Sequence, residues 1–162
     1  MFDNRQGLER AVSSYFAGVN TWFTIVERAT FEKQLSETWQ NPSAETCALA
    51  LCMSMIARPP NPTPGSVVQD SVYQTAKSLL GLIQSSAPMS TQLLQAELLV
   101  SMYEFSHSLP QQAYLTLGRC FQMTKAFGWH NKLFWAVERK QSMPRELKLC
   151  SILWWSIVYV DG

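Results

Sequence analysis

Residues 114–130 read YLTLGRCFQMTKAFGWH, a stretch with no catalytic motif and a strong helical pattern. Apolar or small side chains recur at the three- and four-residue spacing of one helix face, at Ala113, Leu117, Phe121 and Thr124. Gly128 follows the last of them, and glycine adopts the left-handed conformation needed beyond a helix end without steric cost. The stretch therefore predicts an amphipathic helix that ends at this glycine and packs against other helices.

The rest of the chain divides into similar segments on both sides of this stretch. Helices are expected over residues 8–21, 24–41, 43–58, 68–87, 90–107, 110–128 and 144–160. Ser43 and Ser90 suit the N-cap position, where a hydroxyl accepts a hydrogen bond from a free amide of the first turn. Pro110 suits the first turn of its helix, where no amide hydrogen is needed. The helices that begin at residues 90 and 110 are expected to run antiparallel.

Apolar spacing also predicts which side chains are buried. In the segments before residue 107, the predicted core positions are Leu8, Val12, Tyr15, Phe16, Val19, Ile25, Phe31, Leu35, Trp39, Val68, Val72, Thr75, Leu79, Leu82, Leu94, Leu98, Met102 and Phe105. Residues 43–58 are apolar on most sides, so we expect that helix at the centre of the fold.

The composition indicates one domain with a packed core. The chain has 162 residues, of which 47% are hydrophobic and 15% charged. Residues 58–65 contain four prolines, which exclude helix and strand pairing and predict an extended internal loop, since neither side has a complete core alone. No segment has the alternation of a half-buried strand. The expected fold is all-α, a compact array of about seven helices with antiparallel pairs, spanning residues 1–162 as one domain.

Two segments bear on membranes and nucleic acids. Residues 144–160 are apolar all round, but a membrane span needs about 20 such residues, so we expect a helix enclosed by protein. Because such a helix needs neighbours on every side, the chain is expected to be one portion of a longer sequence. Residues 125–148 carry six basic and two acidic side chains, a weaker basic face than a nucleic-acid module shows. Neither a membrane nor direct nucleic-acid contact is therefore expected.

Few residues of the chain are candidates for catalysis or metal binding. The motifs of serine hydrolases, zinc proteases and nucleotide-binding proteins are absent. Glu104 and His107 have the spacing of half a di-iron site, but no second copy exists, so His107 is expected to bond free carbonyls at a helix end. Glu97, Ser101 and Glu104 share a helix face, as a general acid and base would, but a solvated polar stripe is the preferred interpretation. We expect no catalytic, DNA-binding or metal-binding residue, no cofactor and no enzyme activity.

The four cysteines are interpreted as core thiols. Cys47, Cys52, Cys120 and Cys150 are scattered through apolar surroundings, and no secretory leader is visible, which favours a reducing compartment. Cys47 and Cys52 are five residues apart and would point about 140° away from each other on a helix, so they do not share one zinc ion. All four are expected to be buried and free.

The aromatic residues suggest a second kind of site. The candidates for lining an apolar ligand cavity are Trp22, Phe23, Trp129 and Trp154, although aromatic side chains at helical spacing are more often core. Gly118 lies in the middle of a helix, where glycine costs roughly 1 kcal/mol relative to alanine. We expect it to permit the close approach of the helix over residues 92–107 or of the helix around Trp154, so a bulky residue there should destabilise the fold.

Four motifs occur in a family-like order. Residues 15–31 are similar to an opening in which an aromatic pair precedes Pro-Ile-x-His-x-x-x-Phe, with Thr24 and Glu27 in place of the proline and histidine. The helix pair over residues 92–127 is similar to a central block, and its end near Gly128 to a Leu-Gly-Leu-His element. Residues 145–161 are similar to Arg-Arg-x-x-Trp-Trp-x-x-x-x-x-Asp. Together they resemble the middle homology region of fungal binuclear-zinc-cluster transcription factors.

The resemblance implies an all-helical regulatory region of a transcription factor, located in the nucleus. Without the resemblance, a cytoplasmic location is expected. The implied partners of this region are the transcription machinery or the factor's own DNA-binding module, a small-molecule effector, and a second copy in a homodimer. The six-cysteine cluster that binds zinc and contacts DNA in the family is missing here. Two alternatives remain open, a small-molecule sensor with an apolar cavity and an unrelated helical scaffold for protein interactions.

Overall fold

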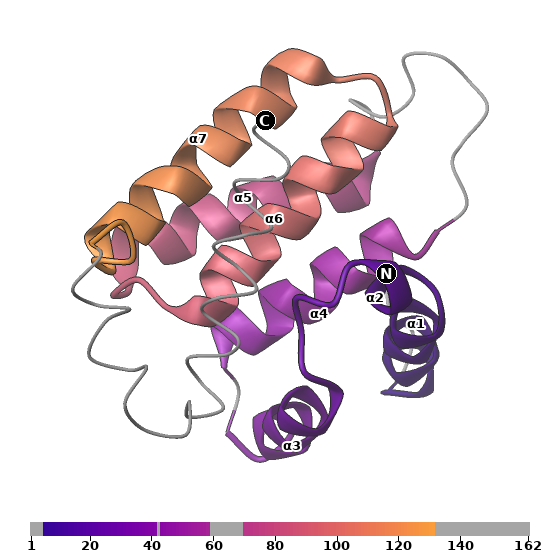
Figure 1. Ribbon diagram of the computed structural model, residues 1–162. Coiled ribbons are helices and arrows are strands. Elements are labelled where there is room, and N and C mark those ends of the chain that lie inside the picture. Colours follow the sequence, from indigo (N-terminus) through magenta and orange to yellow (C-terminus); the bar gives the residue numbers. More distant parts are fainter. Residues whose placement is uncertain (1–4, 42, 59–69, 132–162) are drawn as a thin grey trace.

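The computed structural model describes residues 5–41, 43–58 and 70–131, and every regular element within these ranges is a helix (Figure 1). The helices are α1 (Arg5–Ala17), α2 (Val19–Trp22), α3 (Arg28–Thr38), α4 (Ala44–Ile56), α5 (Ser71–Ser86), α6 (Thr91–Ser106) and α7 (Pro110–Ala126). This confirms the predicted all-α array with antiparallel pairs. The expected helix over residues 144–160 and nearly all of the expected loop over residues 58–65 lie outside the described residues.

The N-terminal region differs from the predicted pair of long helices. Gly18 interrupts the first one at φ −109° and ψ −90°, which separates α1 from the single turn of α2. The second of the two predicted helices corresponds to α3, which begins only at Arg28. Ile25 and Val26 therefore lie in irregular chain before it. The prediction of Ile25 as a helical residue was wrong, although it is fully buried. Burial against the core, and not the helical period, decides the path of this segment.

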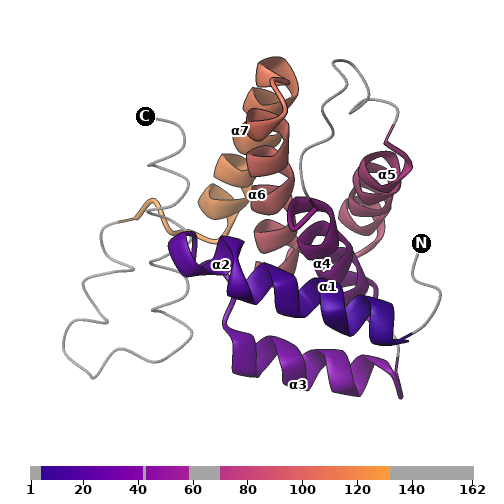
Figure 2. The same cartoon turned by 90° about the vertical axis from the view of Figure 1, so that its right-hand side faces the viewer.

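Helix α4 lies at the centre, as predicted. It packs against α1, α3, α5 and α6, which surround it in the two views of the fold (Figure 2). Its residues are buried on all sides from Ala48 to Met55. The Ser43 hydroxyl accepts a hydrogen bond from the Thr46 amide at 3.3 Å, which confirms the predicted N-cap.

Helices α6 and α7 form the predicted antiparallel pair and pack closely along each other (Figure 1). The Ser90 hydroxyl accepts a hydrogen bond from the Leu93 amide at 3.1 Å and so caps α6. Pro110 occupies the first turn of α7. Gly128 has φ +79° just after α7, as its predicted role as a helix stop requires.

Helix α5 buries a different face from the predicted one. Thr75 is exposed and Leu82 is 65% exposed, so both were wrongly assigned to the core. The buried side chains are Val72, Tyr73, Ala76, Leu80 and Ile83. The predicted and the observed buried faces lie side by side on α5, and packing against α4 determines which of them is buried. The helix begins after Asp70, whose carboxylate accepts a hydrogen bond from the Val72 amide at 2.9 Å.

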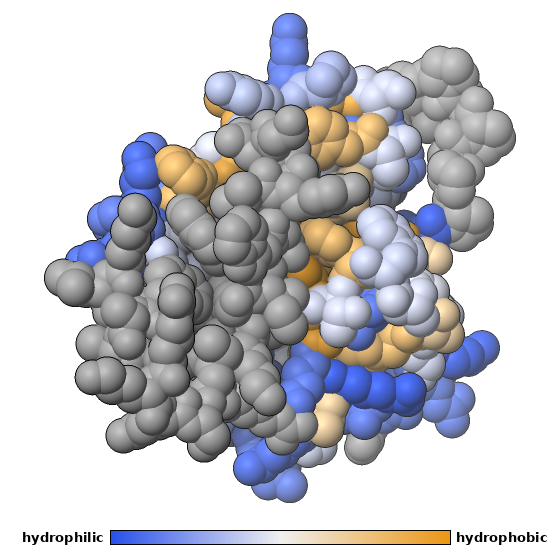
Figure 3. Space-filling model, in the orientation of Figure 1, coloured by the Kyte–Doolittle hydropathy of each residue, from blue (hydrophilic) through white to orange (hydrophobic). Residues whose placement is uncertain are grey.

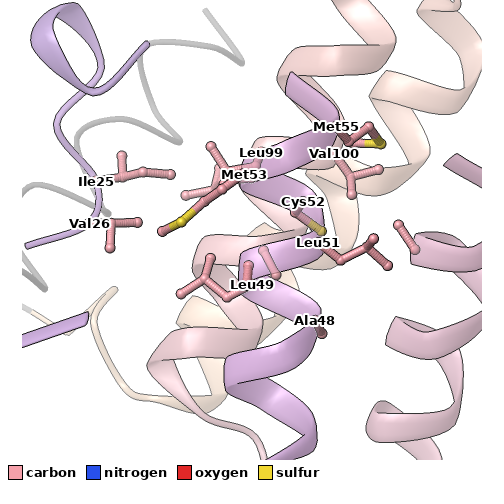
Figure 4. Packing of buried hydrophobic residues seen from close by; sticks show 14 of the residues in the cluster. Ile25, Val26, Ala48, Leu49, Leu51, Cys52, Met53, Met55, Leu99 and Val100 are labelled. Atoms are coloured by element: carbon pink, nitrogen blue, oxygen red, sulfur yellow. The ribbon is translucent and has the colours of Figure 1, made fainter. Parts of the chain in front are cut away.

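The core joins all parts of the described chain into one apolar cluster. In Figure 4 the side chains of Ile25 and Val26 point toward Met53 of α4, and Leu99 of α6 lies beside that methionine. In the view of Figure 3, apolar side chains show mainly near the centre of the face and hydrophilic ones along its margins. Besides Thr75 and Leu82, two further predicted core residues fall outside this cluster, since Trp39 is 44% exposed and Phe105 is 42% exposed.

Candidate functional site

The most unusual feature of the described structure is a pair of buried carboxylates on α6. Glu97 is 1% exposed and Glu104 is fully buried, as is Ser101 between them. The prediction that these three residues form a solvated stripe was wrong. Because α6 has neighbours on several sides, its polar face meets α5 and α7 instead of water. Charged side chains are almost never fully buried unless they are paired, so their partners define the site.

Glu104 receives its partners from α5. Its Oε1 accepts hydrogen bonds from the Tyr73 hydroxyl at 2.6 Å and from the Lys77 ammonium at 2.9 Å. Its Oε2 is buried and has no hydrogen-bond partner in the described structure. The carboxylate is therefore only half satisfied, which is costly in a low-dielectric interior. Burial and the Glu104 carboxylate together raise the pKa of the Tyr73 hydroxyl.

Glu97 is held from both neighbouring helices. Its Oε1 accepts a hydrogen bond from the Gln84 side-chain amide of α5 at 2.5 Å, and its Oε2 one from the Arg119 guanidinium of α7 at 3.4 Å. Burial raises the pKa of the Glu97 carboxyl, while Arg119 and Lys77 oppose that shift. Desolvation outweighs the two cations, so part of the cost of burying this charge remains uncompensated.

Thr116 of α7 connects the two halves into one network. Its hydroxyl accepts hydrogen bonds from Lys77 at 3.0 Å and from Arg119 at 3.4 Å. We call the whole set the carboxylate network; its members are Tyr73, Lys77, Gln84, Glu97, Glu104, Thr116 and Arg119. It starts and ends on α5 and passes through α6 and α7. The carboxylates lie inside, whereas Lys77 is 27% and Arg119 is 45% exposed.

A second group of polar contacts lies beside this network. The Tyr103 hydroxyl donates to Asp70 at 3.1 Å, and the ring of Tyr103 stacks on that of Tyr73 at 5.7 Å. Burial and Asp70 raise the pKa of Tyr103 to about 12. His107 Nδ1 lies 2.8 Å from the Tyr103 carbonyl oxygen at the end of α6, which confirms its predicted role at the helix end.

The cysteines divide into two kinds. Cys52 and Cys120 are fully buried, as predicted, and burial raises the pKa of both thiols, with Glu97 adding to the effect. A protonated thiol is a poor nucleophile and a poor metal ligand. Cys47 is exposed, so its predicted burial was wrong: it occupies a turn of α4 that faces solvent. Cys150 lies outside the described residues. In the described part of the chain, no three histidine, cysteine, aspartate or glutamate side chains lie close enough together to hold a metal ion.

Of the aromatic residues predicted to line a cavity, Trp22 and Phe23 lie next to each other, and Trp129 lies apart from them. Trp22 is 65% exposed in α2, and Trp129 is buried just after α7. Figure 1 places α2 and the end of α7 on opposite sides of the molecule. Phe23 is buried and contacts Trp22, with ring centroids 5.9 Å apart. Trp154 lies outside the described residues, so a cavity that includes it stays a prediction.

Gly118 was predicted to allow close contact with α6. A Cβ atom built on this glycine meets no heavy atom of the described structure within 4 Å, and the residue is exposed. The prediction of a close approach to α6 was therefore wrong, because Gly118 lies on the outer face of α7. The alternative approach, by the helix around Trp154, lies outside the described residues.

A sequence signal for the carboxylate network existed. The only charged residues in α6 are Glu97 and Glu104, and all other side chains of this helix are apolar or uncharged. A solvated helix face usually mixes acidic and basic side chains at i, i+4 spacing, and none occurs here. Their partners Lys77 and Arg119 are on other helices, so only the packing identifies them.

Comparison with known proteins assigns the chain to a family. A model of the fungal-specific transcription factor domain matches residues 12–162. Transcription factor BOA15 of Botryotinia fuckeliana (strain B05.10) is 28% identical over 123 residues, which cover 73% of this chain and 65% of that protein, slightly less than two thirds of its length. No solved structure is significantly similar to the chain. No helix of the described residues is long and apolar enough to cross a membrane. The chain belongs to the fungal-specific transcription factor domain family.

Proposed function

We propose that this chain is the regulatory region of a fungal transcription factor and acts in the nucleus by binding an effector or a protein partner. The observation that supports it best is the carboxylate network, which couples three helices through charges that are costly to bury. A small change in ligand or partner contact shifts the packing of such a region more easily than that of an apolar core. Neither a metal nor a cofactor is part of the proposal.

Direct DNA reading is not part of the proposed role. Several basic side chains of the described ranges lie within 4.0 Å of a carboxylate of the same chain, which reduces their availability for phosphate contacts. The pairs are Arg28–Glu32, Lys33–Glu37, Arg58–Asp70, Lys77–Glu104 and Arg119–Glu97. DNA affinity measured by fluorescence anisotropy should be weak and fall steeply with salt, irrespective of sequence. Sequence-specific retention at moderate salt would contradict the proposal.

Regulation itself is tested with a fusion. The chain is placed between an unrelated DNA-binding domain and an unrelated activation domain, and a reporter gene is measured beside the same fusion without it. We expect the chain to change reporter output by roughly the 5- to 150-fold range of typical coupling energies, with promoter occupancy unchanged. A matched fusion carrying the exposed change Lys33→Met should behave like the unchanged one. Equal output with and without the chain would refute a regulatory role.

A ligand and a second copy of the chain are alternative effectors within this proposal. A thermal-shift screen with apolar small molecules distinguishes them, because only a compound that binds the folded state raises the melting temperature. Sedimentation equilibrium across protein concentrations measures self-association. A melting temperature raised by a compound at constant monomer mass would favour the sensor, and a concentration-dependent mass would favour the homodimer.

A further inference from the structure

Helix α5 is attached to the rest of the domain in two different ways. Toward α4 it packs closely, with an apolar face that includes Ala76, Leu80 and Ile83. Toward α6 its backbone makes few contacts, and it is not among the close neighbours of α7. Figure 2 shows α5 beside α4 and separated from the α6–α7 pair. Long polar side chains therefore span the distance from α5 to α6 and α7.

Those side chains form an interface that is not fully satisfied. Tyr73, Lys77 and Gln84 of α5 reach Glu104 and Glu97 at 2.5 to 2.9 Å, while the second oxygen of Glu104 has no partner. A buried pair repays the loss of hydration only when its geometry is good and its remaining lone pairs are bonded. Moving α5 outward would return Glu97 and Glu104 to water and so recover hydration, at the loss of the Tyr73–Tyr103 ring contact and of the Tyr103–Asp70 hydrogen bond.

We propose that α5 is the movable helix of this domain: it turns on its apolar contact with α4 between a closed position, held by the carboxylate network, and an open position in which both carboxylates are hydrated. The half-exposed Lys77 and Arg119 are the groups through which water or an effector first reaches the network. The inference deepens the proposed function by naming the element that moves, and it rests on that function only for the use made of the motion.

Hydrogen–deuterium exchange of the intact chain tests the motion without any reference to transcription. In Lys77→Met the Glu104 charge loses its cation, so the closed position is weakened. In the open position α5 packs against α4 alone, and a helix with fewer neighbours unfolds locally more often. We therefore expect amide exchange in α5 to rise by about tenfold or more, while α4, α6 and α7 keep their protection. The matched control is Lys125→Met on α7, whose ammonium lies over the Phe121 ring and outside the network. It should leave α5 exchange unchanged.

Two outcomes would overturn the proposal. One is equal acceleration in all helices, which would show that α5 opens only with global unfolding. The other is unchanged α5 exchange in the folded Lys77→Met variant. If that variant does not fold by circular dichroism, Tyr73→Phe weakens the same contact more gently and is measured by the same criteria.

A second variant should not show the faster α5 exchange expected of Lys77→Met. With both carboxylates neutralised in Glu97→Gln/Glu104→Gln, no charge gains hydration on opening, and we expect α5 exchange at or below that of the unchanged chain. Faster α5 exchange than in the unchanged chain would contradict the proposal. The reporter fusion separates this inference from the proposed function: local opening of α5 without any change in reporter output would support the motion and refute its regulatory use.

Discussion

On the side of α6 that faces α4, Leu99 and Val100 lie beside Met53 and Met55, and all four are fully buried (Figure 4). The side that faces α5 and α7 instead buries Glu97 and Glu104, with cations supplied by both neighbouring helices. An apolar contact loses stability in proportion to the area and volume removed, whereas a buried charge depends on each individual partner. One helix thus combines a side that fixes the fold with a side that responds to small changes.

The largest expected effect is on the apolar side. Leu99→Ala removes a fully buried side chain and leaves a cavity against α4. We expect a loss of about 3 kcal/mol in the free energy of unfolding, measured by urea denaturation. The matched control is Leu115→Ala on α7, where the side chain is 68% exposed and a change within about 0.5 kcal/mol is expected. Similar losses in both variants would remove the distinction between core and surface.

On the polar side, Tyr73→Phe deletes the hydroxyl that donates to Glu104 at 2.6 Å. Since Lys77 remains, we expect a loss of about 2 kcal/mol, as for a hydrogen bond to a charged group. Tyr114→Phe is the control, because that tyrosine is 70% exposed on α7 and its change should be close to neutral. A neutral result for Tyr73→Phe would mean that the network adds nothing to stability.

The stability of the polar side of α6 is also expected to depend on pH. Burial raises the pKa of Glu97 above 4.5 in the folded state. The folded chain therefore holds this proton more tightly than the unfolded chain, and the stability that Glu97 contributes is present below pH 4.5 and lost as pH rises through the raised pKa. In Glu97→Gln this dependence disappears. The free energy of unfolding of the variant minus that of the unchanged chain should grow with pH, by at most about 1.4 kcal/mol per pH unit.

Denaturation series from pH 4 upward, taken at the same salt concentration, measure this difference. Glu32→Gln serves as the control, because the Arg28–Glu32 pair is half-exposed and such pairs contribute little. A difference that shrinks with rising pH would show that the cations outweigh desolvation at Glu97.

The smallest expected effects on stability come from two glycines, Gly118 on the outer face of α7 and Gly128 just after its end. Gly118→Ala should stabilise the fold by about 0.5 kcal/mol, because the position is helical, exposed and free of described neighbours within 4 Å. Gly128→Ala should instead destabilise it by about 1 kcal/mol, since φ is +79° there. Both are measured as shifts in melting temperature. A destabilising Gly118→Ala would indicate that another part of the chain packs against that face.

Local rules predicted the framework of the fold well. Ser43, Ser90, Pro110 and Gly128 mark helix ends through bonds and dihedral angles within a few residues, and the structure confirms each of them. Residues 43–58 are apolar on most sides of the helix, and this was enough to place α4 at the centre. Such features depend on neighbours in the sequence, so the sequence contains the information directly.

Burial of the remaining faces depends on neighbours in space. On α5, Leu82 and Ile83 are adjacent and equally apolar, yet only Ile83 is buried, because α4 lies on its side of the helix. On α6, the spacing of Glu97 and Glu104 fits a solvated stripe as well as a buried pair. Their partners are 13 to 31 positions away in the sequence, and no local pattern connects them.

The sequence by itself determined an all-α chain, most of its helix ends, its central apolar helix and its resemblance to a family of transcription factor domains. These follow from hydrogen bonding and hydrophobic periodicity over one or two turns, and from motifs in order along the chain. Only the tertiary structure decided that two glutamates lie in the interior, that Cys47 does not, and that α5 reaches α6 and α7 through polar side chains. Solvation of a charge depends on everything packed around it, and that is a property of the assembled helices.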